Sequence, residues 1–179
     1  TNKKMTFLRV EKISSNHVQP MSVFMSYSIL VTCPRNMEYL LEAELRALGV
    51  DIERVSPLGV SAQMDLSLIY RVSLWSRLAN RILVRLFSGE VNNVAALSQL
   101  CSQFDWSTVF TVDRTLAIDY YGESSFIKNT MFGAQLIKDA IVDHFKPTGS
   151  RPSVDKQKPN IRLQAHWRRG ELTVSLDVV

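Results

Sequence analysis

The chain has 179 residues, of which 46% are hydrophobic and 21% charged, a balance that excludes a chain disordered throughout. Lysine and arginine outnumber aspartate and glutamate by 21 to 17, and the resulting charge of +4 suits a polyanionic partner without requiring one. The two cysteines form no CxxC pair and the histidines have no metal-ligand spacing, so we expect neither a disulfide framework nor a metal site.

The first half of the chain alternates between strand and helix patterns. Residues 1–26 show no sustained period and are expected to be a loosely ordered extension. Ser28–Cys33 is an apolar run typical of a strand, and Pro34–Gly49 carries apolar residues at helical spacing. Ile52–Ser56 and Leu58–Gln63 are predicted to be two short strands.

A second helix and a fourth strand complete this unit. Asp65 is expected to cap the helix, and Arg81–Glu90 alternates as a strand does. The residues that the helix is expected to turn to one side are Leu68, Val72, Trp75 and Ala79. The order β-α-β-β-α-β is the split pattern of a ferredoxin-like unit, so we predict an α+β fold.

A second unit follows. Val94–Phe104 is predicted to be a short helix, Thr115–Tyr121 a strand, and Asn129–Phe145 a long helix in which the small Gly133 permits close packing. A polar loop over 146–159 separates this helix from two final strands.

The final strands form a β-hairpin whose register can be predicted. If Arg169 and Gly170 make the turn, the apolar residues all fall on one face, and Arg162 on the other face lies opposite Asp177. The apolar pairs are then Trp167 with Leu172, Ala165 with Val174, and Leu163 with Leu176.

Three separated blocks carry a family resemblance. They are LIYRVSLWSRLANRI (68–82), IKNTMFGAQLIKDAIVDHF (127–145) and RPSVDKQKPNIRLQAHWRRGELTVSLDVV (151–179). In this order they resemble the N-terminal part of the bifunctional bacterial 23S rRNA guanine-N2 methyltransferases. Where that family commonly has glycine ahead of the first helix, this chain has Asn36, and we expect asparagine to supply the same backbone conformation.

The resemblance implies a domain plan. A ferredoxin-like lead-in would cover 27–67, its structural unit running to about residue 92, and a THUMP RNA-binding domain with a mixed sheet and a C-terminal hairpin would cover 68–179. It also implies a downstream methyltransferase domain of the same polypeptide, with S-adenosylmethionine as that domain's cofactor, and 23S ribosomal RNA as the partner.

No catalytic residue is predicted within this chain. Its seven glycines are isolated and no two of its prolines are adjacent, so it has neither a glycine-rich turn to hold S-adenosylmethionine nor an Asn/Asp-Pro-Pro-aromatic stretch. We therefore expect no cofactor here. No apolar stretch approaches the roughly 20 residues that cross a bilayer, and we expect a cytoplasmic protein without membrane contact.

Basic residues mark two candidate RNA-binding places. From residue 146 onward seven basic residues face three acidic ones, an excess equal to that of the whole chain. The start of the long helix adds a cation and unpaired backbone donors, although Asn129 could simply cap that helix. The candidate residues are Lys128, Asn129, Thr130, Arg151, Lys156, Lys158, Arg162, Arg168 and Arg169.

Two other functions remain open from the sequence. The parent protein could modify tRNA, or DNA at adenine N6, because related modules and motifs occur in such enzymes. Alternatively, the chain could be a non-catalytic protein-interaction domain with a basic surface. Base stacking by Trp75, Trp106 or Trp167 is not favoured, because each lies in an apolar pattern expected to face a core.

Overall fold

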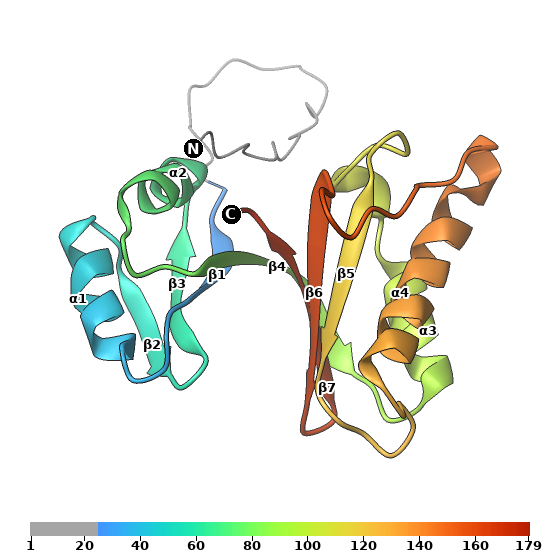
Figure 1. The fold of residues 1–179 in the computed structure, drawn as a ribbon, viewed down its shortest axis with the longest axis horizontal. Helices are drawn as coiled ribbons and strands as arrows, with labels where there is room; N and C mark the ends of the chain where they lie inside the picture. Colours follow the sequence, from blue (N-terminus) through green and yellow to red (C-terminus); the bar gives the residue numbers. More distant parts are fainter. Residues whose placement is uncertain (1–24) are drawn as a thin grey trace, which may run out of the picture. The chain divides into compact units, whose positions relative to one another are not determined.

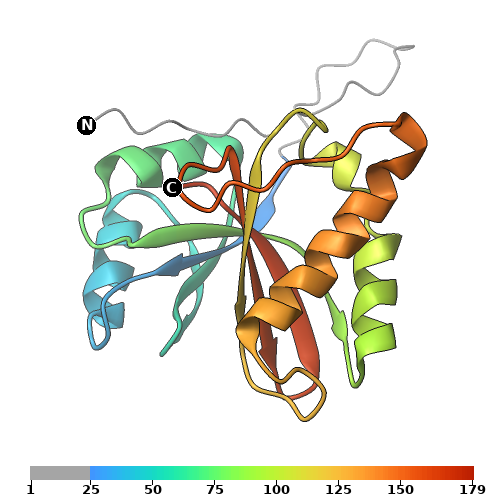
Figure 2. The ribbon, with the colours of Figure 1, turned by 45° about the vertical axis from the view of Figure 1, so that its right-hand side comes forward.

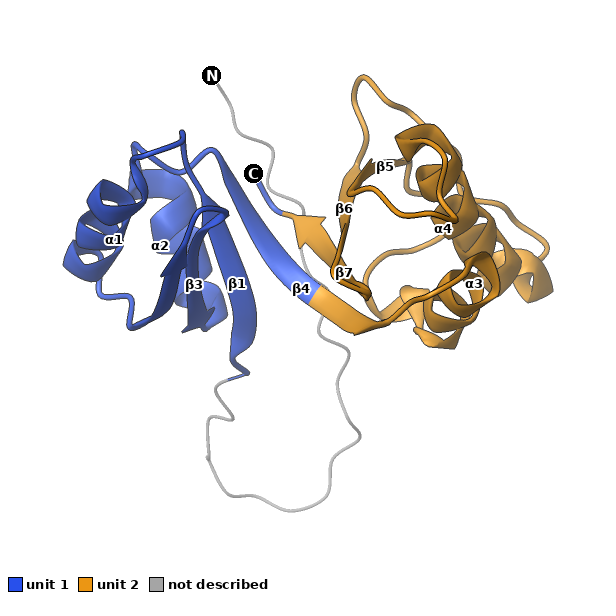
Figure 3. Ribbon diagram, turned by 90° about the horizontal axis from the view of Figure 1, so that it is seen from below, with its two compact units in different colours: residues 1–3, 11–85, 178–179 blue, residues 4–10, 86–177 orange. Residues whose placement is uncertain are grey.

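A computed structural model describes residues 25–179, so the predicted extension over 1–26 lies outside the described residues except for its last two positions (Figure 1). The described chain divides into two compact units. The first holds residues 25–85 together with 178–179, and the second holds residues 86–177 (Figure 3). Strand β4 (Arg81–Glu90) contributes its first half to one unit and its second half to the other.

The first unit has the predicted β-α-β-β-α-β order. Its elements are β1 (Tyr27–Thr32), α1 (Glu38–Ala47), β2 (Ile52–Ser56), β3 (Gly59–Met64), α2 (Leu66–Trp75) and the start of β4. The strands are ordered β2-β3-β1-β4 with antiparallel neighbours. Both helices lie on the same side of these strands (Figure 3). The ferredoxin-like arrangement predicted from the sequence is confirmed.

Two local predictions at the helix starts are also confirmed. Asn36 has a φ of 68°, a left-handed conformation that asparagine tolerates better than most residues. The Asp65 side chain caps α2 by accepting a hydrogen bond of 2.7 Å from the Leu68 amide.

The predicted buried side of α2 is wrong in part. Val72 is buried as expected, but its buried neighbours are Ile69 and Ser73, and Trp75 is 70% exposed. The helix also ends at Trp75 and never reaches Ala79.

A contact with α1 accounts for this early end. The Glu44 carboxylate accepts hydrogen bonds from the Ser76 hydroxyl (2.6 Å) and from the Arg77 amide (2.9 Å). Ser76 itself has an extended backbone conformation, with ψ of 134°. Because a charged acceptor binds these groups strongly, the chain leaves the helix where Glu44 holds it.

The second unit carries the remaining elements. They are α3 (Val94–Gln103), the short 3₁₀ helix η1 (Trp106–Thr108), β5 (Leu116–Tyr121), α4 (Thr130–Phe145), the 3₁₀ turn η2 (Lys146–Thr148), β6 (Ile161–Arg168) and β7 (Glu171–Asp177). The strands are ordered β4-β7-β6-β5, with β5 and β6 parallel and β6 and β7 antiparallel. Helices α3 and α4 cover one side of them (Figure 2). The sheet is therefore mixed, as predicted.

Aromatic side chains fill part of the core of this unit. Trp106 is fully buried and donates a hydrogen bond of 2.9 Å from its indole nitrogen to the Cys101 carbonyl. Its ring meets Phe87 and Phe104 edge to face, an orientation that aromatic quadrupoles favour. Trp106 is thus a core residue, as the sequence predicts.

The register of the C-terminal hairpin matches the prediction in every pair, from Trp167 opposite Leu172 to Arg162 opposite Asp177. The turn residues Arg169 and Gly170 both have positive φ, 51° and 88°, as a two-residue turn of type I′ requires. This turn twists in the same sense as the strands and so fixes the pairing.

Gly133 brings α4 close to β5. A Cβ atom at this position would lie 2.7 Å from the ring of Tyr120 on β5, closer than packed atoms approach each other. Tyr120 is almost fully buried beneath the helix. The first turns of α4 can therefore pack on β5 only where a residue has no side chain.

We predict that Gly133→Ala destabilises the second unit by about 1–3 kcal/mol, the usual cost of overpacking a core. In an unhindered helix the same change stabilises by about 0.5–1 kcal/mol. The sign of the change in unfolding free energy therefore shows whether Gly133 is crowded by β5. Urea unfolding of the chain measures it, and Gln135→Ala on the exposed side of α4 is the control. A stabilised Gly133→Ala variant would contradict the close approach.

Candidate nucleic-acid interface

The first candidate place is the start of α4. The Asn129 side chain accepts a hydrogen bond of 2.7 Å from the Phe132 amide, so this residue caps the helix. Lys128, Asn129 and Thr130 are all exposed. The cap uses one of the amides of the first turn, and the others remain directed outward at the positive end of the helix dipole.

The hairpin turn lies at the same end of this unit. Phe126, in the loop that leads into α4, meets Trp167 edge to face with ring centroids 5.9 Å apart. Gly122 at the start of that loop lies directly against the Trp167 backbone. Trp167 precedes the exposed Arg168 and Arg169, so the loop and the turn are joined (Figure 1). We call Lys128, Asn129, Thr130, Arg168 and Arg169 the turn-end cluster.

The other candidates lie at the opposite end of the β5–β6 pair. Val154 bridges the first residue of β5, Leu116, and the Asn160 side chain accepts a hydrogen bond from the Thr115 amide. The loop around them carries the remaining candidates. We call Arg151, Lys156, Lys158 and Arg162 the loop-end cluster. Since β5 and β6 are parallel, their starts and their ends lie apart, and the structure separates the predicted residues into two groups.

Arg162 differs from the rest of its cluster. Its guanidinium forms an ion pair of 2.7 Å with Asp119 and a hydrogen bond with the Lys156 carbonyl, and it is half-buried. Arg151, Lys156 and Lys158 are exposed. Arg162 therefore has a structural role in joining β6 to its neighbours, and the exposed cations are freer to meet a phosphate.

A cleft of about 650 Å³ runs beside β5. Lys156 and Arg162 of the loop-end cluster and Thr130 of the turn-end cluster line it. Its other lining residues come mainly from β5 and α4 and include Ile118, Tyr120, Tyr121, Met131, Gln135 and Lys138. Sequence reasoning missed Tyr120 and the cleft, because only the packing of α4 on β5 creates it.

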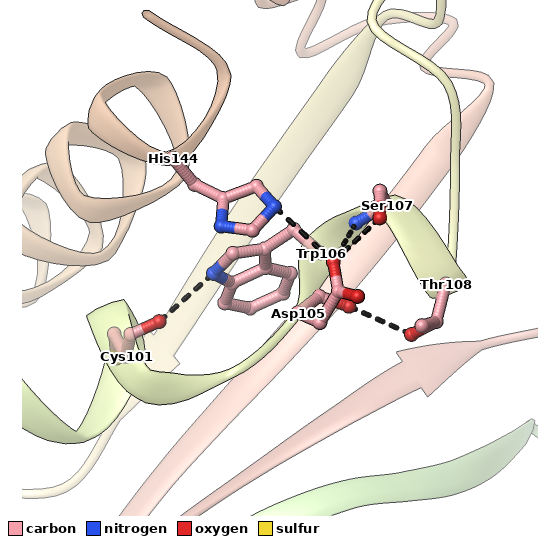
Figure 4. A network of polar contacts seen from close by, with 6 residues as sticks. All are labelled: Cys101, Asp105, Trp106, Ser107, Thr108 and His144. Atoms are coloured by element: carbon pink, nitrogen blue, oxygen red, sulfur yellow. Dashed lines mark hydrogen bonds and ion pairs between the residues drawn. The ribbon is translucent and has the colours of Figure 1, made fainter. Parts of the chain in front are cut away.

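A polar network joins η1 to α4 (Figure 4). Asp105 accepts hydrogen bonds from the Ser107 amide and hydroxyl, and His144 lies 3.3 Å from the same carboxylate. The carboxylate stands between the serine and the histidine, whereas a nucleophilic serine needs the imidazole beside it. The network therefore holds η1 against α4 and has no arrangement for nucleophilic catalysis.

Neither a metal-binding cluster nor a membrane-spanning helix occurs within residues 25–179. In this range no cluster of three or more His, Cys, Asp or Glu side chains could hold a metal ion, and both Cys33 and Cys101 are free thiols. None of the helices in this range is both long and apolar enough to span a bilayer.

His166 lies on β6, two residues from Arg168. Burial and, to a lesser degree, the charge of Arg168 hold the pKa of the His166 imidazole below its ordinary value of 6.5. Because the folded state disfavours the protonated ring, His166 costs no stability above pH 6.5 and lowers the stability of the fold as the pH falls below that value.

We predict that Arg168→Ala raises the pKa of His166 while Arg168→Lys leaves it close to that of the wild type, because lysine keeps the charge. An NMR titration of the His166 ring protons measures both. A pKa that does not respond to the loss of Arg168 would show that burial acts alone.

Comparison with known proteins assigns both units to families. Residues 28–83 match the RlmL ferredoxin-like domain and residues 91–177 match the THUMP domain. The chain is 54% identical over 156 residues to the ribosomal RNA large subunit methyltransferase K/L of Legionella pneumophila, covering 87% of this chain and 22% of that protein. It is 41% identical over 153 residues to the protein of the same name from Pseudomonas aeruginosa, covering 85% and 21%.

The fold also occurs among solved structures. A predicted N6-adenine-specific DNA methylase from Listeria monocytogenes superposes with a TM-score of 0.73 at 19% identity, covering 86% of this chain and 40% of that one. At this identity the likeness concerns the fold alone. The chain thus spans about a fifth of the length of the methyltransferases it resembles in sequence. Residues 28–83 belong to the RlmL ferredoxin-like domain family, and residues 91–177 belong to the THUMP domain family.

Proposed function

We propose that this chain docks structured ribosomal RNA for a catalytic domain that methylates guanine N2 of 23S rRNA. The observation that carries the proposal is the THUMP domain over 91–177. It lies in a chain that is 54% identical over 156 residues to a protein named as an rRNA large subunit methyltransferase. Binding would rest on phosphate and shape contacts made by exposed cations of the second unit.

The placement of the cations supports this mode of binding. The turn-end and loop-end clusters lie at the two ends of the six-residue strand β5, which corresponds to roughly 20 Å at about 3.3 Å per residue. One folded RNA could therefore be held at two separate phosphates. Two-point contact fixes the orientation of an RNA, and base sequence plays no part in it.

The methyl transfer itself would take place outside the residues of this chain. S-adenosylmethionine is the expected methyl donor, and the isolated glycines of the chain offer no turn that could hold it. Docking by a separate module lowers the entropic cost of bringing the target base to the cofactor. Flipping of the base would belong to the catalytic domain.

A protein-contact role is a second candidate, and one observation favours it for the first unit. Two residues of α1 and two of α2 are large, apolar and exposed by 58% to 78%: Tyr39, Leu40, Leu74 and Trp75. Exposed apolar residues in such number on neighbouring helices are typical of an interaction surface. This role would not compete with RNA docking by the second unit.

The turn-end cluster is tested with the triple variant Lys128→Ala, Arg168→Ala and Arg169→Asn. Asparagine suits the positive φ of residue 169, so the charge is removed while the turn is preserved. We predict that the triple variant binds an rRNA hairpin more weakly. The slope of log K against log salt concentration should also become shallower by about two to three, because each lost phosphate contact reduces the slope by about 0.7–0.9.

A matched control removes the same charge from the first unit, through Arg35→Ala, Arg54→Ala and Arg77→Ala, at three exposed positions. The salt titration is repeated with a DNA duplex and a tRNA of similar length. An equal loss in both triple variants would assign binding to net charge alone. Preference for DNA or tRNA over the rRNA hairpin would favour the other methyltransferase classes.

A further inference from the structure

Tyr120 carries a polar group without a partner. Its side chain is 3% exposed, and its hydroxyl is the buried side-chain polar atom that has no hydrogen-bond partner within residues 25–179. Burial also raises the pKa of this phenol, so it stays protonated and can donate. A buried hydroxyl without a partner is costly to a fold, and Tyr120 is also one of the residues that line the cleft beside β5.

The cleft beside β5 suits a ligand that is flat and apolar with a charged end. Tyr120 lines it together with Ile118, Tyr121 and Met131, and the last two are 46% and 69% exposed. Three cations and one carboxylate lie among the same lining residues, namely Lys138, Lys156, Arg162 and Asp119, so the lining has a net positive charge. Lys138 also forms an ion pair of 3.3 Å with Asp139. A volume of about 650 Å³ is within the range of small-ligand sites.

The outer edge of β5 adds backbone polar groups that can form hydrogen bonds with a ligand. The amide and carbonyl of Leu116 point away from β6, because they bond to Ser153 and Asp155 on the outer side. Strand alternation then directs the backbone groups of Ile118 and Tyr120 to the same outer side. The backbone groups of these two residues can donate and accept hydrogen bonds. Two residues are too few to pair with an added peptide strand, because strands average about five to six residues.

We propose that this cleft takes one unpaired nucleotide of the docked RNA, and this inference rests on the proposed function. The base would enter between β5 and α4, with its edge at the Tyr120 hydroxyl and the outer backbone groups of β5. The phosphate would meet Lys138 or Lys156. Unpaired bases are the parts of RNA that proteins read by hydrogen bonds and stacking.

The cleft is also continuous with the proposed phosphate contacts. Thr130 of the turn-end cluster and Lys156 of the loop-end cluster both line it. An RNA strand held at the two clusters would therefore pass the mouth of the cleft. The Tyr120 hydroxyl is closed off in this structure, so the lining of the cleft would have to move for a base to reach it.

The test is Tyr120→Phe, which removes the hydroxyl and keeps the ring that packs on Gly133. Fluorescence anisotropy would measure binding of the chain to two RNA duplexes of the same sequence, one fully paired and one with a four-nucleotide ACGU bulge. We predict that Tyr120→Phe binds the bulged duplex roughly five- to tenfold more weakly, as expected for one lost hydrogen bond. Binding to the paired duplex should be unchanged.

Two controls separate the cleft from the fold and from docking. Tyr39→Phe, at a 78% exposed position of the first unit, should change neither affinity. The unfolding midpoint of Tyr120→Phe should equal or exceed that of the wild type, because the lost hydroxyl has no partner in the fold. This excludes misfolding as the cause of weaker binding.

The outcomes distinguish this inference from the proposed function. If Tyr120→Phe binds both duplexes as the wild type does while the turn-end triple variant weakens both, RNA docking stands and the nucleotide cleft is wrong. If neither variant changes the binding of either duplex, both proposals fail. Selective loss of affinity for the bulged duplex supports the cleft.

Discussion

The register of the β6–β7 hairpin is the constraint on which the second unit depends. β6 pairs with β5 on one side and with β7 on the other, and β7 lies next to β4. A slip of one residue in β7 would turn its buried apolar side chains, Leu172, Val174 and Leu176, to the opposite face of the sheet. The positive φ values of Arg169 and Gly170 exclude such a slip, because a turn of this type allows one pairing only.

The hairpin also determines where its neighbours lie. Trp167, the last half-buried residue before the turn, donates a hydrogen bond to the Val91 carbonyl and packs against Phe126. The second contact holds the loop that leads into α4. The same hairpin thereby brings Arg168 and Arg169 to the end of the unit where α4 begins, and it leaves β5 as an edge strand with a cleft beside it.

Much of the fold could be predicted because its signals are local. The hairpin follows from strict alternation, and the helix caps at Asp65 and Asn129 follow from side chains that act three residues away. The exposed position of Trp75 could not be predicted, since α2 ends where Glu44, some thirty residues earlier, binds the chain. The division of the basic residues into two clusters, and the position of Tyr120 beside a cleft, likewise depend on which strands pair in parallel.

Backbone amide NMR spectra recorded while an rRNA hairpin is added test RNA docking by the second unit most directly. Phosphate contacts at the start of α4 and at the hairpin turn should shift the amides of residues 127–133 and 167–170 first and most strongly. Residues 27–85 of the ferredoxin-like unit should change little. Shifts confined to α1 and α2, or none at the start of α4 and at the turn, would contradict docking through the THUMP domain.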